Sequence, residues 1–168
     1  MQIRDRIKAF RRVRARDLIP NEKNWRRHPK GQRDALNGVL TEIGYADALI
    51  ARETPEGLTL IDGHLRAETT PDMEVPVLIL DVTEEEADKI LLSLDPLAAM
   101  AESDRDALAG LLATVESESV AVKNLFARIA EENGISPPDF DIATLDDQQR
   151  LDEKKKVQCP ECGHEFTP

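Results

Sequence analysis

The sequence predicts an α+β fold, in which a small mixed β-sheet with flanking helices is followed by a helical C-terminal region and a short cysteine-containing tail. Strand-like and helix-like segments alternate before residue 95, which is the pattern of a sheet covered by helices. Residues 96–134 have helical periodicity throughout, and both cysteines lie in CPECGH near the C-terminus. Only 4% of the 168 residues are aromatic, so the core must consist mainly of aliphatic side chains.

Apolar periodicity predicts the individual elements. Ile3, Ile7 and Phe10 recur at i, i+4 and i+7 and predict a basic amphipathic helix over residues 2–12. Alternation over 13–18, followed by the apolar Ile19, then predicts a first strand that ends at Pro20, before a polar loop. The later predicted elements are a helix over 32–43, hairpin strands over 47–53 and 58–62, a short helix over 65–69, a buried strand over 75–82, and a helix from Thr83 to Ser93 that begins with a capping box.

Changes in composition divide the chain into five predicted segments. They are a basic helix, a sheet-containing domain, a helical region, a linker and a tail, at residues 1–12, 13–95, 96–134, 135–156 and 157–168. No apolar run reaches about 18 residues, and the charged N-terminus lacks the apolar region of a signal peptide. We therefore expect a cytoplasmic protein that does not enter a membrane.

The charge of the chain is unevenly distributed. Residues 1–33 hold 12 Lys and Arg against 3 Asp and Glu, although the whole chain has a net charge of −11. The acidic remainder argues against a surface that lies on nucleic acid over its whole length. The basic N-terminal third is either a local anion-binding surface or a solvated face that pairs with acidic residues elsewhere in the chain.

The segment IDGHLRAE, residues 61–68, combines groups that suit an anion. Gly63 allows the backbone to turn sharply where a strand meets a helix, and the forked donors of Arg66 match phosphate oxygens. His64 adds a donor or an acceptor, depending on its tautomer. The alternative is a plain tight turn, with Arg66 bonded to Asp62 or Glu68 and His64 half-exposed.

The upstream loop PNEKNWRRHPK is also basic. It holds Asn24, Trp25, Arg26, Arg27, His28 and Lys30. If the strand over 13–18 lies beside the strand over 58–62, this loop and the turn at Gly63 face one pocket. Like charges that meet there would repel each other unless an anion lies between them. Trp25 is either a core or hairpin-covering residue or a platform for base stacking.

In this order, the motifs resemble the ParB/sulfiredoxin superfamily, and in particular the ParB N-terminal domain. The resemblance covers residues 12–100. It rests on the Asn-x-Arg loop at Asn24 to Arg27, the Gly-x-x-Arg step at Gly63 to Arg66, and the VPV strand at Val75 to Val77. The Gly-His-x-Arg form of the step is similar to that of phage and DNA-methylase-associated members.

The resemblance implies a nucleotide site. It places Gly63, His64 and Arg66 at the phosphates of a nucleoside triphosphate, CTP or ATP, with Mg²⁺, and it places Asn24, Arg26 and Arg27 opposite them. Sulfiredoxins carry their catalytic cysteine where this chain has His64, which argues against sulfiredoxin chemistry. Partition ParB proteins often carry Glu-Arg within the step, where this chain has His64-Leu65.

Three functions are compatible with these residues. The first is a regulatory module that binds a nucleotide or DNA and forms a homodimer through its long helices. The second is a nuclease, an NTPase or a phosphotransferase that uses Asp62, His64 and Glu68 as acid–base groups or metal ligands. The third is a phage accessory factor that acts through its acidic helices. Residues 96–134 contain no basic recognition helix, so operator binding of the partition type is not supported.

The tail CPECGH resembles half of a zinc knuckle. Cys159 and Cys162 have the C-x-x-C spacing of zinc ligands, and His164 follows two residues later. Tetrahedral Zn²⁺ needs four ligands, so the remainder would come from a second chain. The alternative is the remnant of a zinc ribbon without metal.

Overall fold

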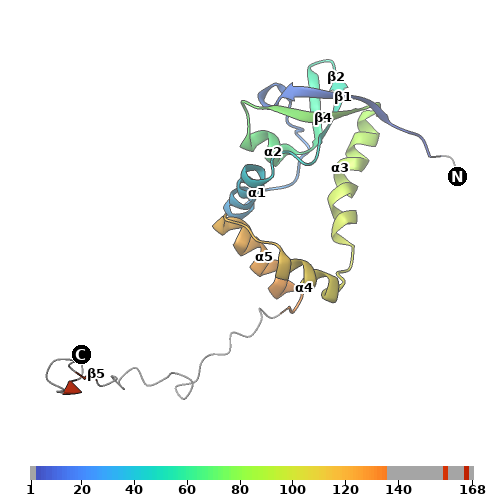
Figure 1. Ribbon diagram of the computed structural model, residues 1–168. Helices are drawn as coiled ribbons and strands as arrows, with labels where there is room; N and C mark the ends of the chain where they lie inside the picture. The colour runs from blue at the N-terminus through green and yellow to red at the C-terminus, as the bar shows by residue number, and fades with distance from the viewer. Residues whose placement is uncertain (1–2, 136–156, 159–164, 167–168) are drawn as a thin grey trace. The chain divides into compact units, whose positions relative to one another are not determined.

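The computed structural model describes residues 3–135, 157–158 and 165–166 (Figure 1). Residues 1–135 form one compact unit, and residues 136–168 form a second one that contains the short antiparallel pair β5 (Val157–Gln158) and β6 (Glu165–Phe166). The first unit contains β1 (Ile7–Arg14), the 3-10 turn η1 (Ala15–Asp17), α1 (Lys30–Glu42), β2 (Leu49–Thr54), β3 (Gly57–Asp62), α2 (His64–Thr69), β4 (Glu74–Leu80), α3 (Glu84–Ala99), α4 (Arg105–Thr114) and α5 (Val120–Glu132). None of the helices in the described ranges is long and apolar enough to cross a membrane.

The four strands of the first unit form a small mixed sheet in the order β1-β4-β2-β3. β4 runs parallel to β2, and the other two neighbouring pairs are antiparallel. One core cluster joins β2 and β4 to η1 and α2, and its fully buried members include Leu49, Ala51, Val75, Val77 and Ile79. The predicted α+β class with a small mixed sheet and flanking helices is therefore confirmed.

The predicted basic helix over residues 2–12 is wrong. Residues 7–14 form β1, the edge strand that pairs with β4 from Ile7–Leu80 to Arg14–Glu74. The same residues also fit a period of two, since Ala9 and Val13 are half-buried and pack against the core cluster. Hydrogen bonding to the buried strand β4 favours this period over the helical spacing of Ile3, Ile7 and Phe10.

The predicted first strand over 13–18 is also wrong, and its predicted place beside the third strand holds only at Ile19, just before the predicted end at Pro20, where an isolated parallel bridge joins Ile19 to Thr59 of β3. Residues 15–17 form η1, and β1 lies at the opposite edge of the sheet from β3. The chain nevertheless reaches β3 directly after η1. The Ile19 N–H donates to the Leu58 carbonyl at 2.8 Å, and the Ile19 carbonyl accepts from the Leu60 N–H at 2.8 Å. This bridge brings the 20–29 loop to the end of the sheet where β3 stops.

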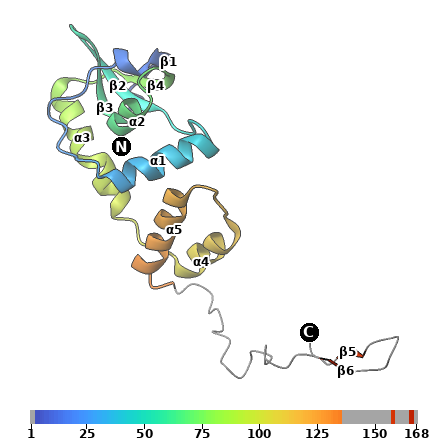
Figure 2. The same ribbon diagram turned by 90° about the vertical axis from the view of Figure 1, so that its left-hand side faces the viewer.

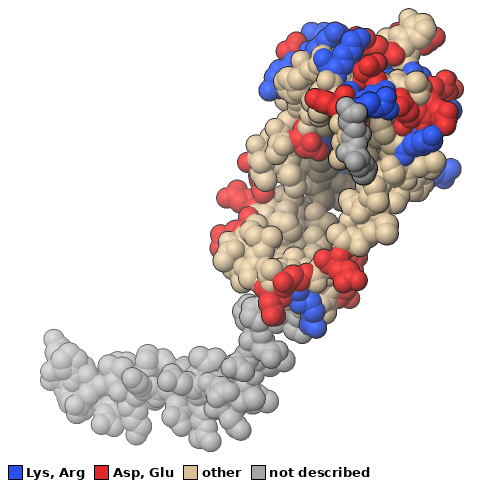
Figure 3. Space-filling model, turned by 90° about the vertical axis from the view of Figure 1, so that its right-hand side faces the viewer, with Lys and Arg blue, Asp and Glu red and all other residues tan. Residues whose placement is uncertain are grey.

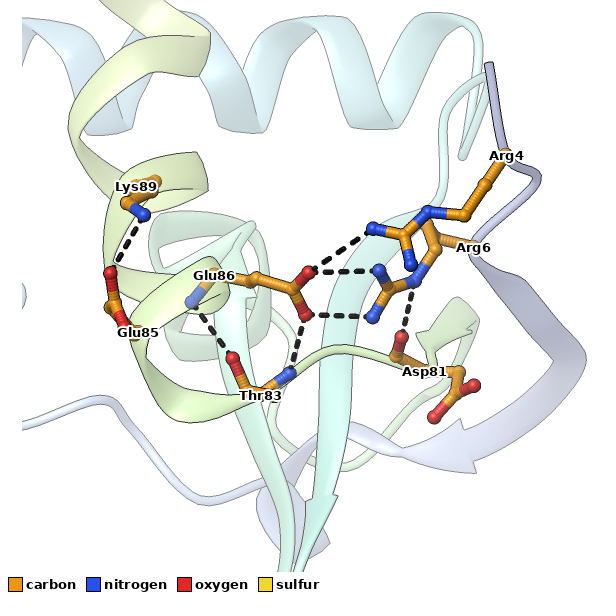
Figure 4. Close-up of polar contacts among 7 residues, drawn as sticks. All are labelled: Arg4, Arg6, Asp81, Thr83, Glu85, Glu86 and Lys89. Carbon is orange, nitrogen blue, oxygen red and sulfur yellow. Dashed lines mark hydrogen bonds and ion pairs between the residues drawn. The ribbon is translucent and has the colours of Figure 1, made fainter. Parts of the chain in front are cut away.

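α3 begins with the predicted capping box. The Glu86 N–H donates to Thr83 Oγ1 at 3.2 Å, and the Thr83 N–H donates to Glu86 Oε2 at 2.9 Å. Figure 4 shows that Glu86 also faces Arg6, whose guanidinium makes two hydrogen bonds to it at 2.7 and 2.9 Å. These bonds from Arg6 are the main cause of the lowering of the Glu86 pKa to about 2. The segment before β1 is thereby fastened to the start of α3.

The helical region consists of three helices. α3 runs through Pro96 to Ala99, past its predicted end at Ser93. α5 packs on α1, as Figure 2 shows. Gly38 of α1 allows a close approach, since a Cβ at this position would lie only 2.4 Å from Ser119 Oγ. Glu42, at the end of α1, accepts hydrogen bonds from the Ser117 hydroxyl and from the next two backbone N–H groups, at 2.8 to 3.0 Å. α1 therefore contacts both the sheet domain, through α2, and the helical region.

Candidate functional site

A cavity of about 300 Å³ lies between the 20–29 loop, α1, the start of α2 and α3. The structure brings the basic loop and the Gly63 turn together at this cavity, although the strands that precede them are not neighbours. Its lining includes five of the six residues predicted to hold phosphate, Asn24, Arg26, Gly63, His64 and Arg66. The sixth, Arg27, is exposed and lines a shallow hollow beside Trp25 instead.

Gly63 connects β3 to α2 in a conformation that suits glycine. Its φ is +91°, in the left-handed region where a Cβ is strained. A Cβ at this position would also lie 2.5 Å from Leu49 Cγ, inside the core. This sharp turn directs the start of α2 so that His64 and Arg66 line the cavity.

His64 is buried, with 7% of its surface exposed, and fixes the basic loop in place. Its Nε2 accepts a hydrogen bond from the Asn21 N–H at 3.1 Å, so the ring is neutral and carries its proton on Nδ1. Burial lowers the His64 pKa, and the nearby Asp62 and Glu68 oppose this only in part. The side chain thus positions the loop through Asn21, and the nitrogen that a general base would use is occupied.

Arg66 is held by two carboxylates. Its two terminal nitrogens donate to Asp47 Oδ2 at 2.6 Å and to Asp62 Oδ2 at 2.8 Å, and its side chain is 18% exposed. The hydrogen bond from Arg66 is the main cause of the lowered pKa of Asp47. The pairing with Asp62, one of the two alternatives that the sequence left open, is thus present beside a cavity. Asp47 is 75% exposed, so this half of the clamp is open to solvent.

Arg26 faces the cavity from the loop. Its Nε lies 2.6 Å from Asp95 Oδ2 on α3, yet the geometry of this ion pair does not give a hydrogen bond, and the buried Nε is left without a partner. Its guanidinium lies over the Trp25 ring, 4.7 Å from the centroid. Trp25 is 54% exposed, so the interpretation of this side chain as a core residue is wrong.

The three predicted acid–base residues do not converge on one point. Asp62 is engaged by Arg66 and lines the cavity, and His64 is engaged by Asn21. Glu68 is exposed, lies 3.9 Å from Arg33, and lines a separate hollow on the other side of His64. The arrangement is one of charge pairs and does not resemble a nucleophile with its base.

Sequence reasoning missed the carboxylates that neutralise the site. Asp95 and Asp47 come from α3 and from the segment before β2, and neither belongs to a recognisable motif. Only the three-dimensional arrangement brings them to Arg26 and Arg66. Cys159, Cys162 and His164 lie outside the described residues. Within the described ranges, no group of three His, Cys, Asp or Glu side chains is placed to hold a metal ion.

A second, more apolar cavity of about 650 Å³ adjoins the first, between α1 and α5. Gln32, Leu36 and Leu65 line both of them. Asn124 and Arg128 of α5 contribute polar groups to its wall. The two cavities together offer a polar compartment joined to an apolar one, which is a common composition for small-molecule sites.

No protein-family model matches this sequence, and no curated protein does. Among solved structures, the C-terminally truncated chromosome-partitioning protein ParB from Caulobacter crescentus, complexed with CTP-gamma-S, is similar with a TM-score of 0.51 and 17% identity, over 76% of this chain and 72% of that one. The fold is ParB-like. A Pnob8-like ParB-N domain has a TM-score of 0.43 to this chain and 15% identity, over 95% of this chain and 56% of that one. At such identities the ParB likeness concerns the fold alone.

Proposed function

We propose that this ParB-like domain is a regulatory module that binds the phosphates of a nucleoside triphosphate in the cavity between the 20–29 loop and α2. The observation that carries the proposal is the buried Nε of Arg26. It is a charged donor on the cavity wall that lies 2.6 Å from Asp95 Oδ2 without hydrogen-bond geometry, although buried polar groups are nearly always hydrogen-bonded in folded proteins. A phosphate oxygen would satisfy it.

The ion pairs at the cavity are compatible with this ligand. Asp95 and Asp47 are 46% and 75% exposed, so each can move into water when an anion takes its place. Such partly solvated pairs are weak, about 1 kcal/mol or less, and a polyphosphate with several charges can compete with them. In this proposal, Arg26 and Arg66 bind the phosphates and His64 positions the loop.

The size of the site also fits a nucleotide. The first cavity accommodates a polyphosphate, and the adjoining apolar cavity accommodates the sugar and base near Asn124. Mg²⁺, if the nucleotide carries it, would take its ligands from phosphate oxygens and water, with Asp62 on the cavity wall as a carboxylate candidate. The Gly-His-x-Arg form of the turn supports assignment to the phage and methylase-associated type. Homodimer formation, a cytoplasmic location, and zinc at Cys159, Cys162 and His164 stay predictions.

The test is ligand-induced stabilisation and fluorescence. CTP or ATP with Mg²⁺ at about 100 times its dissociation constant should raise the free energy of unfolding by about 2.7 kcal/mol. Trp25 is the only tryptophan, and it stacks on Arg26, so its emission should change with the same midpoint.

Two variants and one control complete this test. Arg26→Ala and Arg66→Ala should each abolish the stabilisation, whereas Lys89→Ala, an exposed cation of α3, should preserve it. The proposal fails if no triphosphate stabilises the folded wild-type chain, or if the cavity variants bind as well as wild type. Release of phosphate over hours would instead favour the enzyme alternative.

A further inference from the structure

The face of β1 that points away from the core cluster carries an aromatic ring and two arginines in one row. Phe10, Arg12 and Arg14 alternate along the strand, and their register partners on β4 are Leu78, Pro76 and Glu74. Residues two apart on a strand point to the same side, about 6.8 Å from each other. Phe10 is 57% exposed, and both arginines are exposed.

The two arginines of this row differ from the neighbouring Lys and Arg residues, which form ion pairs. Lys8 and Arg11 pair with Glu53, Arg16 pairs with Asp72, and Arg6 pairs with Glu86. Within the described part of the chain, no ion pair or hydrogen bond engages the side chain of Arg12 or Arg14. Residues 4–16 hold seven Lys and Arg against one Asp, in a chain with a net charge of −11. In Figure 3, most of the visible Lys and Arg lie at the sheet end, interspersed with Asp and Glu, whereas the end formed by α4 and α5 carries mostly Asp and Glu.

Protection of a sheet edge explains only part of this arrangement. Charged side chains on an edge strand do prevent pairing with other chains. Charge alone would serve that role, and it gives no reason for a large exposed aromatic ring next to the arginines in the same row. An exposed ring beside two arginines offers a stacking surface as well as charge.

We propose that this face of β1 binds single-stranded nucleic acid, with a base stacked on Phe10 and the adjacent phosphates on Arg12 and Arg14. Basic side chains along a strand, with an aromatic ring next to them in the same row, provide both contacts that such a partner needs. The spacing of alternate residues is close to that of successive phosphates on an extended single strand. In a duplex the bases stack on one another, so no base would be available to stack on Phe10. This surface lies on β1 and does not depend on the nucleotide cavity.

The experiment measures fluorescence anisotropy of a labelled oligo-dT of about 12 nucleotides with the full chain over a range of salt concentrations. Phe10→Leu keeps an apolar side chain without the ring and should weaken binding about tenfold. Arg12→Gln with Arg14→Gln should lower the slope of log affinity against log salt by about 1.4, since each phosphate contact on a single strand contributes about 0.7. The charge-matched control, Lys89→Gln with Lys123→Gln, should keep both affinity and slope.

The outcomes separate this proposal from its alternatives and from the nucleotide site. Melting curves first establish that each variant is folded. Absence of oligo-dT binding by the folded wild type, unchanged affinity in Phe10→Leu, or equally tight binding of a duplex with no dependence on Phe10 would each overturn the proposal. Arg26→Ala and Arg66→Ala should leave oligo-dT affinity unchanged, so failure of the cavity hypothesis would not affect this result.

Discussion

The cavity and the outer face of β1 both present arginines, but the two sets differ in every physical respect. Arg26 and Arg66 in the cavity are partly buried, and each lies against a carboxylate from another element. Arg12 and Arg14 on β1 are exposed and, in the described ranges, without such partners. The same residue type thus serves as part of the folded framework in one place and as a solvated charge in the other.

The difference follows from solvation. A charge removed from water must be compensated within the protein, and therefore Asp47, Asp62 and Asp95 accompany the cavity arginines. An exposed charge is compensated by water and salt, so β1 needs no acids of its own. Substitutions in the cavity should therefore change stability strongly, whereas those on β1 should change it little.

The largest effect is expected at the turn that shapes the cavity. Gly63→Ala should lower the free energy of unfolding by about 3 kcal/mol, because the left-handed φ and the contact with Leu49 both oppose a Cβ. Urea denaturation measures it. Gly31→Ala is the matched control: that position has open space and no positive φ, so its stability should be unchanged or slightly higher. Equal effects in the two variants would show that the turn is not constrained.

The next effect concerns the Arg66 clamp. Arg66→Gln should cost about 2 kcal/mol in urea denaturation, because it leaves Asp62 and Asp47 facing each other without the cation between them. Asp47→Asn removes only the exposed half and should cost less than about 1 kcal/mol. The same Asp47→Asn variant should bind a triphosphate more tightly than wild type, since it removes a competitor for Arg66. Weaker binding would contradict displacement of Asp47 by the ligand.

A smaller effect is expected from pH, through His64. Its pKa in the folded state lies below the ordinary value of 6.5, so the unfolded chain takes up the proton first as pH falls. The contribution of neutral His64 to the free energy of unfolding is complete above pH 6.5. It is lost as the pH drops from there toward the lowered folded-state pKa. His64→Gln keeps an acceptor for the Asn21 N–H without titrating, and should flatten this part of the stability curve. An unchanged slope in the His64→Gln variant, measured by urea denaturation between about pH 5 and 8, would contradict this assignment.

The smallest effect is expected on β1. Arg12→Gln with Arg14→Gln should change the free energy of unfolding by no more than about 0.5 kcal/mol, because these side chains make no ion pair in the described part of the structure. Urea denaturation at low and at high salt measures this. A loss of more than about 1 kcal/mol would mean that the two arginines belong to the framework, as those of the cavity do.

The sequence predicted most of the sheet and its surroundings. The β2–β3 hairpin, α2, β4 and the capping box of α3 follow from turn residues, buried apolar runs and local hydrogen-bonding groups. The meeting of the basic loop with Gly63 was also expected, although the neighbouring strands assumed for it were not the right ones. Local chemistry therefore predicted which residues meet at the cavity.

The features that the sequence did not predict depend on contacts between residues far apart in the chain. Residues 7–14 fit both a helical and a strand period, and pairing with β4, 60 to 73 positions away in the sequence, decides between them. The partners of Arg26 and Arg66 come from α3 and from the segment before β2, so only folding reveals that the site is already neutralised. Burial of His64 likewise depends on the loop that covers it.

The contact between α1 and α5 has a consequence for the whole first unit. Gly38 lets the two helices approach closely, and Glu42 accepts a hydrogen bond from the Ser119 N–H at the start of α5. Gln32 precedes both residues on α1 by one to three helical turns and lines both cavities. A tilt of α1 at its cavity end would therefore also move α5, which packs on α1, and α4, which packs on α5. Bulkier residues at position 38 would loosen that coupling while leaving the cavity lining intact.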